Sequence, residues 1–137
     1  MIHQKIILRS MDKPSVKDTV EDINWLCDSF GFSTGRDIER FTAKTLITLL
    51  RRISREAGVA SEELARDLHT SPARVNYHVR SLMDSGFLVR ERRRIFLRAG
   101  SMKAAVEEVR KDANRIFDDL ALIAQEIDSA MGIKHRE

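Results

Sequence analysis

The sequence predicts a mainly α-helical protein that contains one small β-hairpin and ends in a long helix. Three observations predict this class. Apolar residues recur at steps of three and four in several segments, which is the period of an α-helix. Two short apolar runs flank a charged turn near residue 92, and residues 102–130 keep a seven-residue period without a breaker. A chain of 137 residues is one domain's worth and can bury a core.

The N-terminal part, residues 1–35, is predicted to form an arm and one helix that together support a dimer. Residues 1–9 alternate weakly between apolar and polar and are interpreted as a short strand. A helix is expected to start at Pro14 and to end at Gly31. The single cysteine, Cys27, lies in the apolar stripe of that helix, so we expect a buried hydrophobe and no disulfide framework.

The middle part, residues 36–100, is predicted to hold three helices and the hairpin. The first helix is expected to start at Ile38 and to end near Gly58. A short second helix follows and is expected to have Ser61 as its cap. The third is predicted over residues 72–85, because proline is well suited to the first helical position and a glycine follows the last one.

The hairpin is predicted from the runs FLVR and RIFLR, which a tight turn at Glu91–Arg93 separates. Arginines are expected on the turn and on the outer face. The apolar residues expected on the buried face are Phe87, Val89, Ile95 and Leu97. Two short helices joined by a turn and followed by a hairpin make a helix-turn-helix with a wing.

The C-terminal part, residues 101–137, is predicted to be a long helix with a short tail. Its apolar seam keeps the coiled-coil period over about four heptads. At 1.5 Å per residue the helix is about 45 Å long, which exceeds what a domain of this size covers. We therefore expect a homodimer, the commonest oligomer. An alternative is a helix that folds back on the N-terminal helix of its own chain. The predicted dimerisation residues are Val106, Val109, Ala113, Ile116, Leu120, Ile123 and Ile127.

The charge is distributed unevenly along the chain. The net charge is +3, and residues 1–35, 36–98 and 99–137 carry −1, +6 and −2 respectively. A positive middle part is expected when one region of a small protein faces a polyanion. No apolar run is long enough to cross a membrane and no secretory signal is present at the N-terminus, so a cytoplasmic location is expected.

The sequence offers no residues for catalysis or metal binding. The histidines His3, His69 and His135 show no ligand spacing with His78 or Cys27. There is no glycine-rich phosphate loop and no nucleophile elbow. We therefore expect no enzyme activity, no cofactor and no metal. His78 flanks the buried stripe of its helix and is expected to be packed and hydrogen-bonded.

The outer face of the helix at residues 72–85 carries side chains that suit DNA. Arginine can pair with guanine O6 and N7, asparagine with adenine N6 and N7, and tyrosine can reach a phosphate. Hydroxyls at a helix N-terminus can also contact phosphate. For each residue alone, a solvated helix face is an equally good interpretation. The predicted DNA-binding residues are Thr70, Ser71, Arg74, Asn76, Tyr77, Arg80, Arg90, Arg92, Arg93 and Arg94.

The stretch SEELARDLHTSPARVNYHVRSLMDSGFLVRERRRIFLR resembles the winged helix-turn-helix of ArsR-type transcription regulators, and the whole layout is similar to archaeal ArsR-like members. The resemblance rests on a short helix of the ELA type, on a recognition helix led by serine with His78 before an aliphatic residue, and on the GFLV step into the wing. It covers about residues 44–98, and MarR-type regulators share much of it.

The resemblance implies a dimeric DNA-binding regulator with Arg74, Asn76, Tyr77 and Arg80 in the groove. Metal-sensing ArsR members carry a cysteine on the helix before the recognition helix. The stretch EELARDL has none, so metal-dependent derepression does not carry over.

The leading hypothesis is a homodimeric, sequence-specific regulator that binds double-stranded DNA. One alternative is a protein-interaction module, in which the winged helix is a scaffold and the long helix docks a partner subunit. Another is an architectural protein that binds nucleic acid without sequence preference.

Overall fold

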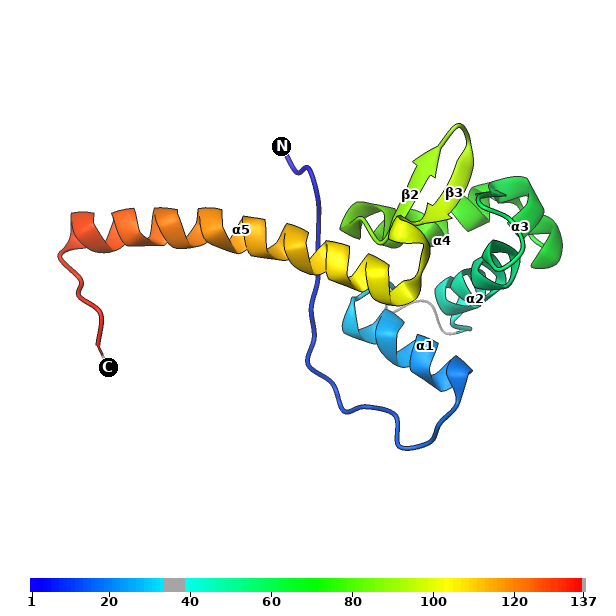
Figure 1. Cartoon of the computed structure of the whole chain (residues 1–137), viewed down its shortest axis with the longest axis horizontal. Helices are drawn as coiled ribbons and strands as arrows, with labels where there is room; N and C mark the ends of the chain where they lie inside the picture. Colours follow the sequence, from blue (N-terminus) through cyan, green and yellow to red (C-terminus); the bar gives the residue numbers. More distant parts are fainter. Residues whose placement is uncertain (34–38, 137) are drawn as a thin grey trace.

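The computed structural model describes residues 1–33 and 39–136, and Figure 1 shows a helical body from which one long helix projects. A small antiparallel sheet of three strands, in the order β1-β3-β2, lies within the body. The predicted mainly helical class with a hairpin is confirmed. The elements are α1 (Thr19–Ser29), α2 (Phe41–Ile53), β1 (Val59–Ala60), α3 (Ser61–Asp67), α4 (Pro72–Ser85), β2 (Leu88–Glu91), β3 (Arg94–Leu97), the 3₁₀ turn η1 (Arg98–Gly100) and α5 (Met102–Met131).

The N-terminal arm differs from its prediction, because residues 1–9 form no strand. The arm is bound at two separate points by backbone bonds. Lys5 N donates to Asp84 O at 2.9 Å, and Arg9 N donates to Ser29 O at 2.8 Å. Both acceptors lie at helix ends and not on a sheet edge, so no ladder of strand hydrogen bonds can form.

The first helix starts later than predicted. It begins at Thr19 and not at Pro14, and Asp18 is its cap: the Asp18 carboxylate accepts from Val20 N at 2.9 Å. A side-chain acceptor at this position satisfies a backbone N–H that the helix itself leaves free. α1 is then joined to the start of α2 by Arg40, which donates to both carboxylate oxygens of Asp28 at 3.0 Å.

The second helix ends at Ile53 and not near Gly58, and Ile38, its expected start, lies outside the described residues. The chain after Ile53 passes close to Phe96 of the wing. A Cβ at Gly58 would lie 2.6 Å from the ring of Phe96, so only glycine allows this approach. The backbone then extends into β1, which pairs with β3.

The helix-turn-helix follows, and its second helix has the predicted bounds. Ser71 caps α4 by accepting from Arg74 N at 3.2 Å, and Gly86 ends it in the left-handed conformation, with φ of 81°. The predicted cap of α3 is wrong. Ala60 holds the cap position without a side-chain bond, and Ser61 is the first helical residue.

The wing buries three of the four residues predicted for its inner face, Phe87, Ile95 and Leu97, but Val89 is only half-buried. Leu88 is buried opposite Leu97, whereas Val89 pairs with Phe96 on the other face and is half-buried. The reason is the position of Phe87. Its N–H donates to Leu82 O, so it belongs to the helix end and the strand alternation starts one residue later.

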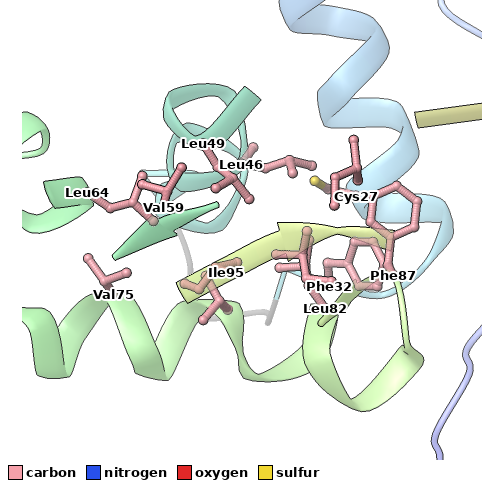
Figure 2. Packing of buried hydrophobic residues seen from close by; sticks show 14 of the residues in the cluster. Cys27, Phe32, Leu46, Leu49, Val59, Leu64, Val75, Leu82, Phe87 and Ile95 are labelled. Carbon is pink, nitrogen blue, oxygen red and sulfur yellow. The ribbon is translucent and has the colours of Figure 1, made fainter. Parts of the chain in front are cut away.

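The core joins helices α1 to α4 to the wing, as Figure 2 shows. Cys27 is fully buried, which confirms the prediction of a small buried hydrophobe. Phe32 stacks on Phe30 with ring centroids 5.2 Å apart, and its ring lies 5.6 Å from that of Phe87. This cluster packs α1 against the junction of α4 and the wing.

The first third of α5 packs on the body and the rest projects from it (Figure 1). Val109 is buried and Val106 is half-buried, so these two predicted dimerisation residues pack in their own chain. Ala113 is half-buried beside the arm, where it lines a groove with Ile6 and Leu8. The helix does not fold back on α1. Beyond Ala113 the predicted seam is exposed at Ile116, Leu120, Ile123 and Ile127.

A buried carboxylate fixes α5 to the body. Asp112, whose side chain is 4% exposed, accepts from Arg98, Arg115 and Gln4. Gln4 also donates to Ser85 O at 2.8 Å, so arm, α4 and α5 meet here. Hydrogen bonding from Arg98, against some desolvation, lowers the pKa of Asp112 to about 2. No helix in the described part of the chain combines the length and apolarity needed to span a membrane.

Candidate nucleic-acid interface

The outward face of α4 is polar and open. Val75, Val79 and Leu82 hold the helix to the core on one side. Because these residues are spaced by four and three, the opposite side is left to solvent. Exposed there are Ala73, Arg74, Asn76, Tyr77 and Arg80.

Arg74 is held at the junction of α2 and α4. Its guanidinium carbon lies 4.0 Å from the centre of the Phe41 ring, a cation–π contact, and its Nη2 lies 3.9 Å from Glu39 Oε2. The guanidinium remains about half exposed. Arg74 is therefore oriented by its own domain while its donors stay accessible.

His78 supports Tyr77 from behind. The His78 Nδ1 is hydrogen-bonded to Thr42 Oγ1 at 3.0 Å, and its ring lies 4.7 Å from that of Phe41. This confirms the prediction of a packed, hydrogen-bonded histidine. The Tyr77 ring meets the His78 ring edge-on at 5.1 Å and is 60% exposed. An exposed phenol braced in this way can reach a phosphate or a sugar with little loss of side-chain entropy.

Asn76 and Arg90 contact each other. Asn76 Oδ1 accepts from Ser61 Oγ at 2.6 Å and from Arg90 Nη2 at 2.9 Å. Arg90 Nη1 also lies 3.4 Å from Ser61 Oγ. Two predicted DNA-binding residues are thus bonded to each other and to Ser61, a residue for which only a capping role was predicted.

The wing turn consists of Arg92 and Arg93, both exposed. The strands pair through Glu91 and Arg94, so the loop has two residues, with φ of 50° and 67°. Two positive φ values are the mark of a type I′ turn, where Asn-Gly is the favoured sequence. Arginine is unfavourable in this conformation, so two arginines here indicate that charge at the tip serves a purpose other than turn stability.

Arg94 lies differently from the two turn arginines. Its Nη1 donates to Gly58 O at 2.9 Å and lies 3.9 Å from Glu63 Oε1. The side chain therefore ties the wing to the start of β1, with half its surface left open. At the entrance to α4, Thr70 is half-buried, and the Ser71 hydroxyl caps the helix.

Arg52 holds the helix-turn-helix in shape and was missed by the sequence reasoning. Its guanidinium bridges α2 to α3, with Nε 2.6 Å from Asp67 Oδ2 and Nη1 2.9 Å from Glu63 Oε2. Hydrogen bonding from Arg52 lowers the pKa of Asp67. Among the described residues, no group of three His, Cys, Asp or Glu side chains could hold a metal ion.

The comparison with protein families agrees with this geometry. Residues 43–89 match the family of winged helix-turn-helix DNA-binding domains. The match runs from the first turn of α2 to the second residue of β2, so it contains α3, α4 and the entry to the wing. The chain therefore carries a winged helix-turn-helix DNA-binding domain. Searches of curated proteins and of solved structures found no match.

Proposed function

We propose that this protein is a sequence-specific transcription regulator of the ArsR-like type that binds duplex DNA as a homodimer. The observation that carries the proposal is the pairing of an open polar face on α4 with a wing whose turn is made of two exposed arginines. Both belong to one rigid body, since β2 follows α4 after two residues and packs against the same core.

The proposed mode of binding places α4 in the major groove. Arg74, Tyr77 and Arg80 then face base edges and the sugar-phosphate backbone. Arg92 and Arg93 at the wing tip meet the flanking phosphates or the minor groove. Arginine suits both places, because it forms bidentate bonds with phosphate and with guanine.

The proposed dimer is supported by the seam of α5. Leu120 and Ile123 are 58% and 54% exposed, although a monomeric protein rarely leaves a helical stripe of aliphatic residues in water. A second copy buries the same stripe on both chains. Two recognition helices then address half-sites about 34–36 Å apart.

A salt titration tests the DNA contact. Affinity for duplex DNA should fall steeply with salt, because each phosphate contact releases counterions. Arg92→Ala with Arg93→Ala should reduce the slope of log K against log salt by about 2. An unchanged affinity and slope in the double variant would refute the wing contact.

The dimer is tested with a matched pair of variants. Leu120→Asp puts a charge on the seam and should give a monomer in sedimentation equilibrium. Leu122→Asp is the control, because Leu122 is equally exposed at 56% but lies off the seam. A dimer that persists in Leu120→Asp, or one lost equally in both variants, would contradict the proposed interface.

The two alternatives predict other surfaces and other specificities. A protein-docking module should present apolar anchors on α4 or the wing. Among the described residues of these elements, Tyr77 is the only large apolar side chain that is exposed. An architectural protein should bind random DNA as tightly as any selected site, so the ratio of specific to competitor binding distinguishes it from a regulator.

A further inference from the structure

We infer that Asn76 reads a base edge only as a hydrogen-bond donor, and that Ser61 and Arg90 are positioning residues that impose this. The inference rests on the proposed function, because it assigns the specificity of one side chain within the groove contact of α4. Asn76 then contacts the N7 atom of a purine without preferring adenine to guanine.

The acceptor capacity of Asn76 is already used inside the protein. An amide oxygen has two lone pairs. Asn76 Oδ1 gives one to Ser61 Oγ, at 2.6 Å, and the other to Arg90 Nη2, at 2.9 Å. The bond from the guanidinium is charge-assisted and therefore stronger than a neutral one.

The orientation of the amide is determined by its partners. Arginine has only donors, so the atom of Asn76 that faces Arg90 has to be the oxygen. The amide nitrogen is then turned away from this contact. In the described part of the chain, Asn76 Nδ2 donates to no protein acceptor. Asn76 itself is exposed, so that donor is available to a ligand.

The network is rigid because its members come from three elements. Ser61 opens α3 and is 4% exposed, Asn76 lies on α4, and Arg90 lies on β2. The Ser61 hydroxyl donates to Asn76 and accepts from Arg90 Nη1 at 3.4 Å, so the three side chains close a ring. Release of Asn76 Oδ1 would leave the buried Ser61 hydroxyl without this acceptor.

The consequence concerns base discrimination. Bidentate recognition of adenine needs both an amide donor to N7 and an amide acceptor for the N6 amino group. With Oδ1 occupied, only the donor remains, and N7 is common to adenine and guanine. Asparagine on a recognition helix is ordinarily expected to prefer adenine, because its amide oxygen accepts from N6. Here that oxygen is already bonded to Ser61 and Arg90, so no preference for adenine is expected.

The test is the selection of bound duplexes from a random pool by the full chain and its variants. One position of the selected duplexes should lose its base preference in Asn76→Ala. In the unchanged protein that position should be a purine, with adenine and guanine about equally represented. Ser61→Ala and Arg90→Ala each release one lone pair of Oδ1, which can then accept from the adenine N6 amino group, so adenine should rise over guanine there by about fivefold or more in each variant. Adding Asn76→Ala to either variant should abolish the rise.

An arginine outside the proposed DNA contacts serves as the control. Arg55→Ala removes an exposed arginine that has no proposed role in binding, and should leave the ratio of adenine to guanine unchanged. Circular dichroism establishes that each variant is folded. If only one of Ser61→Ala and Arg90→Ala folds, that variant alone is enough for the test.

Three outcomes overturn the inference. An unchanged protein that already selects adenine at this position, or a ratio that Ser61→Ala and Arg90→Ala leave unaltered, refutes the inference and leaves the proposed function standing. A pool without any enriched sequence refutes the proposed function, and the inference with it.

Discussion

Replacing the wing turn Arg92-Arg93 by Asn-Gly should make the protein more stable and weaken its binding to DNA. Both arginines have positive φ, 50° and 67°. For a residue with a Cβ this conformation costs about 1 kcal/mol or more, and Asn-Gly adopts it readily. Glycine also raises the entropy of the unfolded chain, which offsets part of the gain. We expect a net stabilisation of about 1 kcal/mol, or about 3–5 °C in Tm.

The same double variant removes two positive charges from the proposed phosphate contact. If each contact contributes about 0.9 to the salt slope, the unchanged protein should lose about tenfold more affinity than the variant between about 50 and 200 mM salt. Stability is measured by thermal unfolding at one protein concentration, because a dimer's Tm depends on concentration. Affinity is measured by fluorescence anisotropy with a labelled duplex.

The control is Arg92→Lys with Arg93→Lys, which keeps both the charge and the unfavourable turn. It should change the Tm and the salt slope little. A lower Tm for the Asn-Gly variant would refute the turn geometry, and an unchanged salt slope would refute the role of the wing in binding.

Two further predictions concern the contacts that hold α4 and α5 in place. Gly86→Ala should lower the free energy of unfolding by about 1–2 kcal/mol in urea denaturation, because φ is 81° and the new Cβ would lie 2.9 Å from Gln4 Nε2; an unaffected stability would show that the backbone there relaxes freely. Ionised Asp112 should stabilise the fold fully at pH values above its ordinary pKa of 3.8. That contribution should be lost as the pH falls toward its folded-state pKa of about 2. The shift corresponds to about 2 kcal/mol. Urea denaturation of Asp112→Asn should show a smaller pH dependence over this window, and an equal one would contradict the assignment.

Local signals in the sequence were sufficient to predict α4 and α5. α4 could be predicted to the residue because Ser71, Pro72 and Gly86 act through the backbone of their immediate neighbours. α5 was predicted as a long helix within residues 101–137, and it runs between the caps Ser101 and Gly132. Such signals do not depend on tertiary contacts with the rest of the chain.

Features that depend on distant neighbours could not be predicted. β1 has two residues, too few for a period, and exists because β3 lies beside it. The ring of Ser61, Asn76 and Arg90 joins residues 15 and 14 positions apart along the chain, and no spacing rule connects them. Arg94 was predicted to bind DNA together with Arg92 and Arg93, and only the fold shows its bond to Gly58 O.

The central claim is that α4 enters the major groove of a specific duplex. Selection of duplexes by the full chain, followed by methylation interference at guanine N7, tests it most directly. We predict an enriched sequence in which interfering guanines form two clusters about one helical turn apart, with N7 facing the protein in the major groove. Binding without an enriched sequence, or without interference at any guanine N7, would contradict the claim.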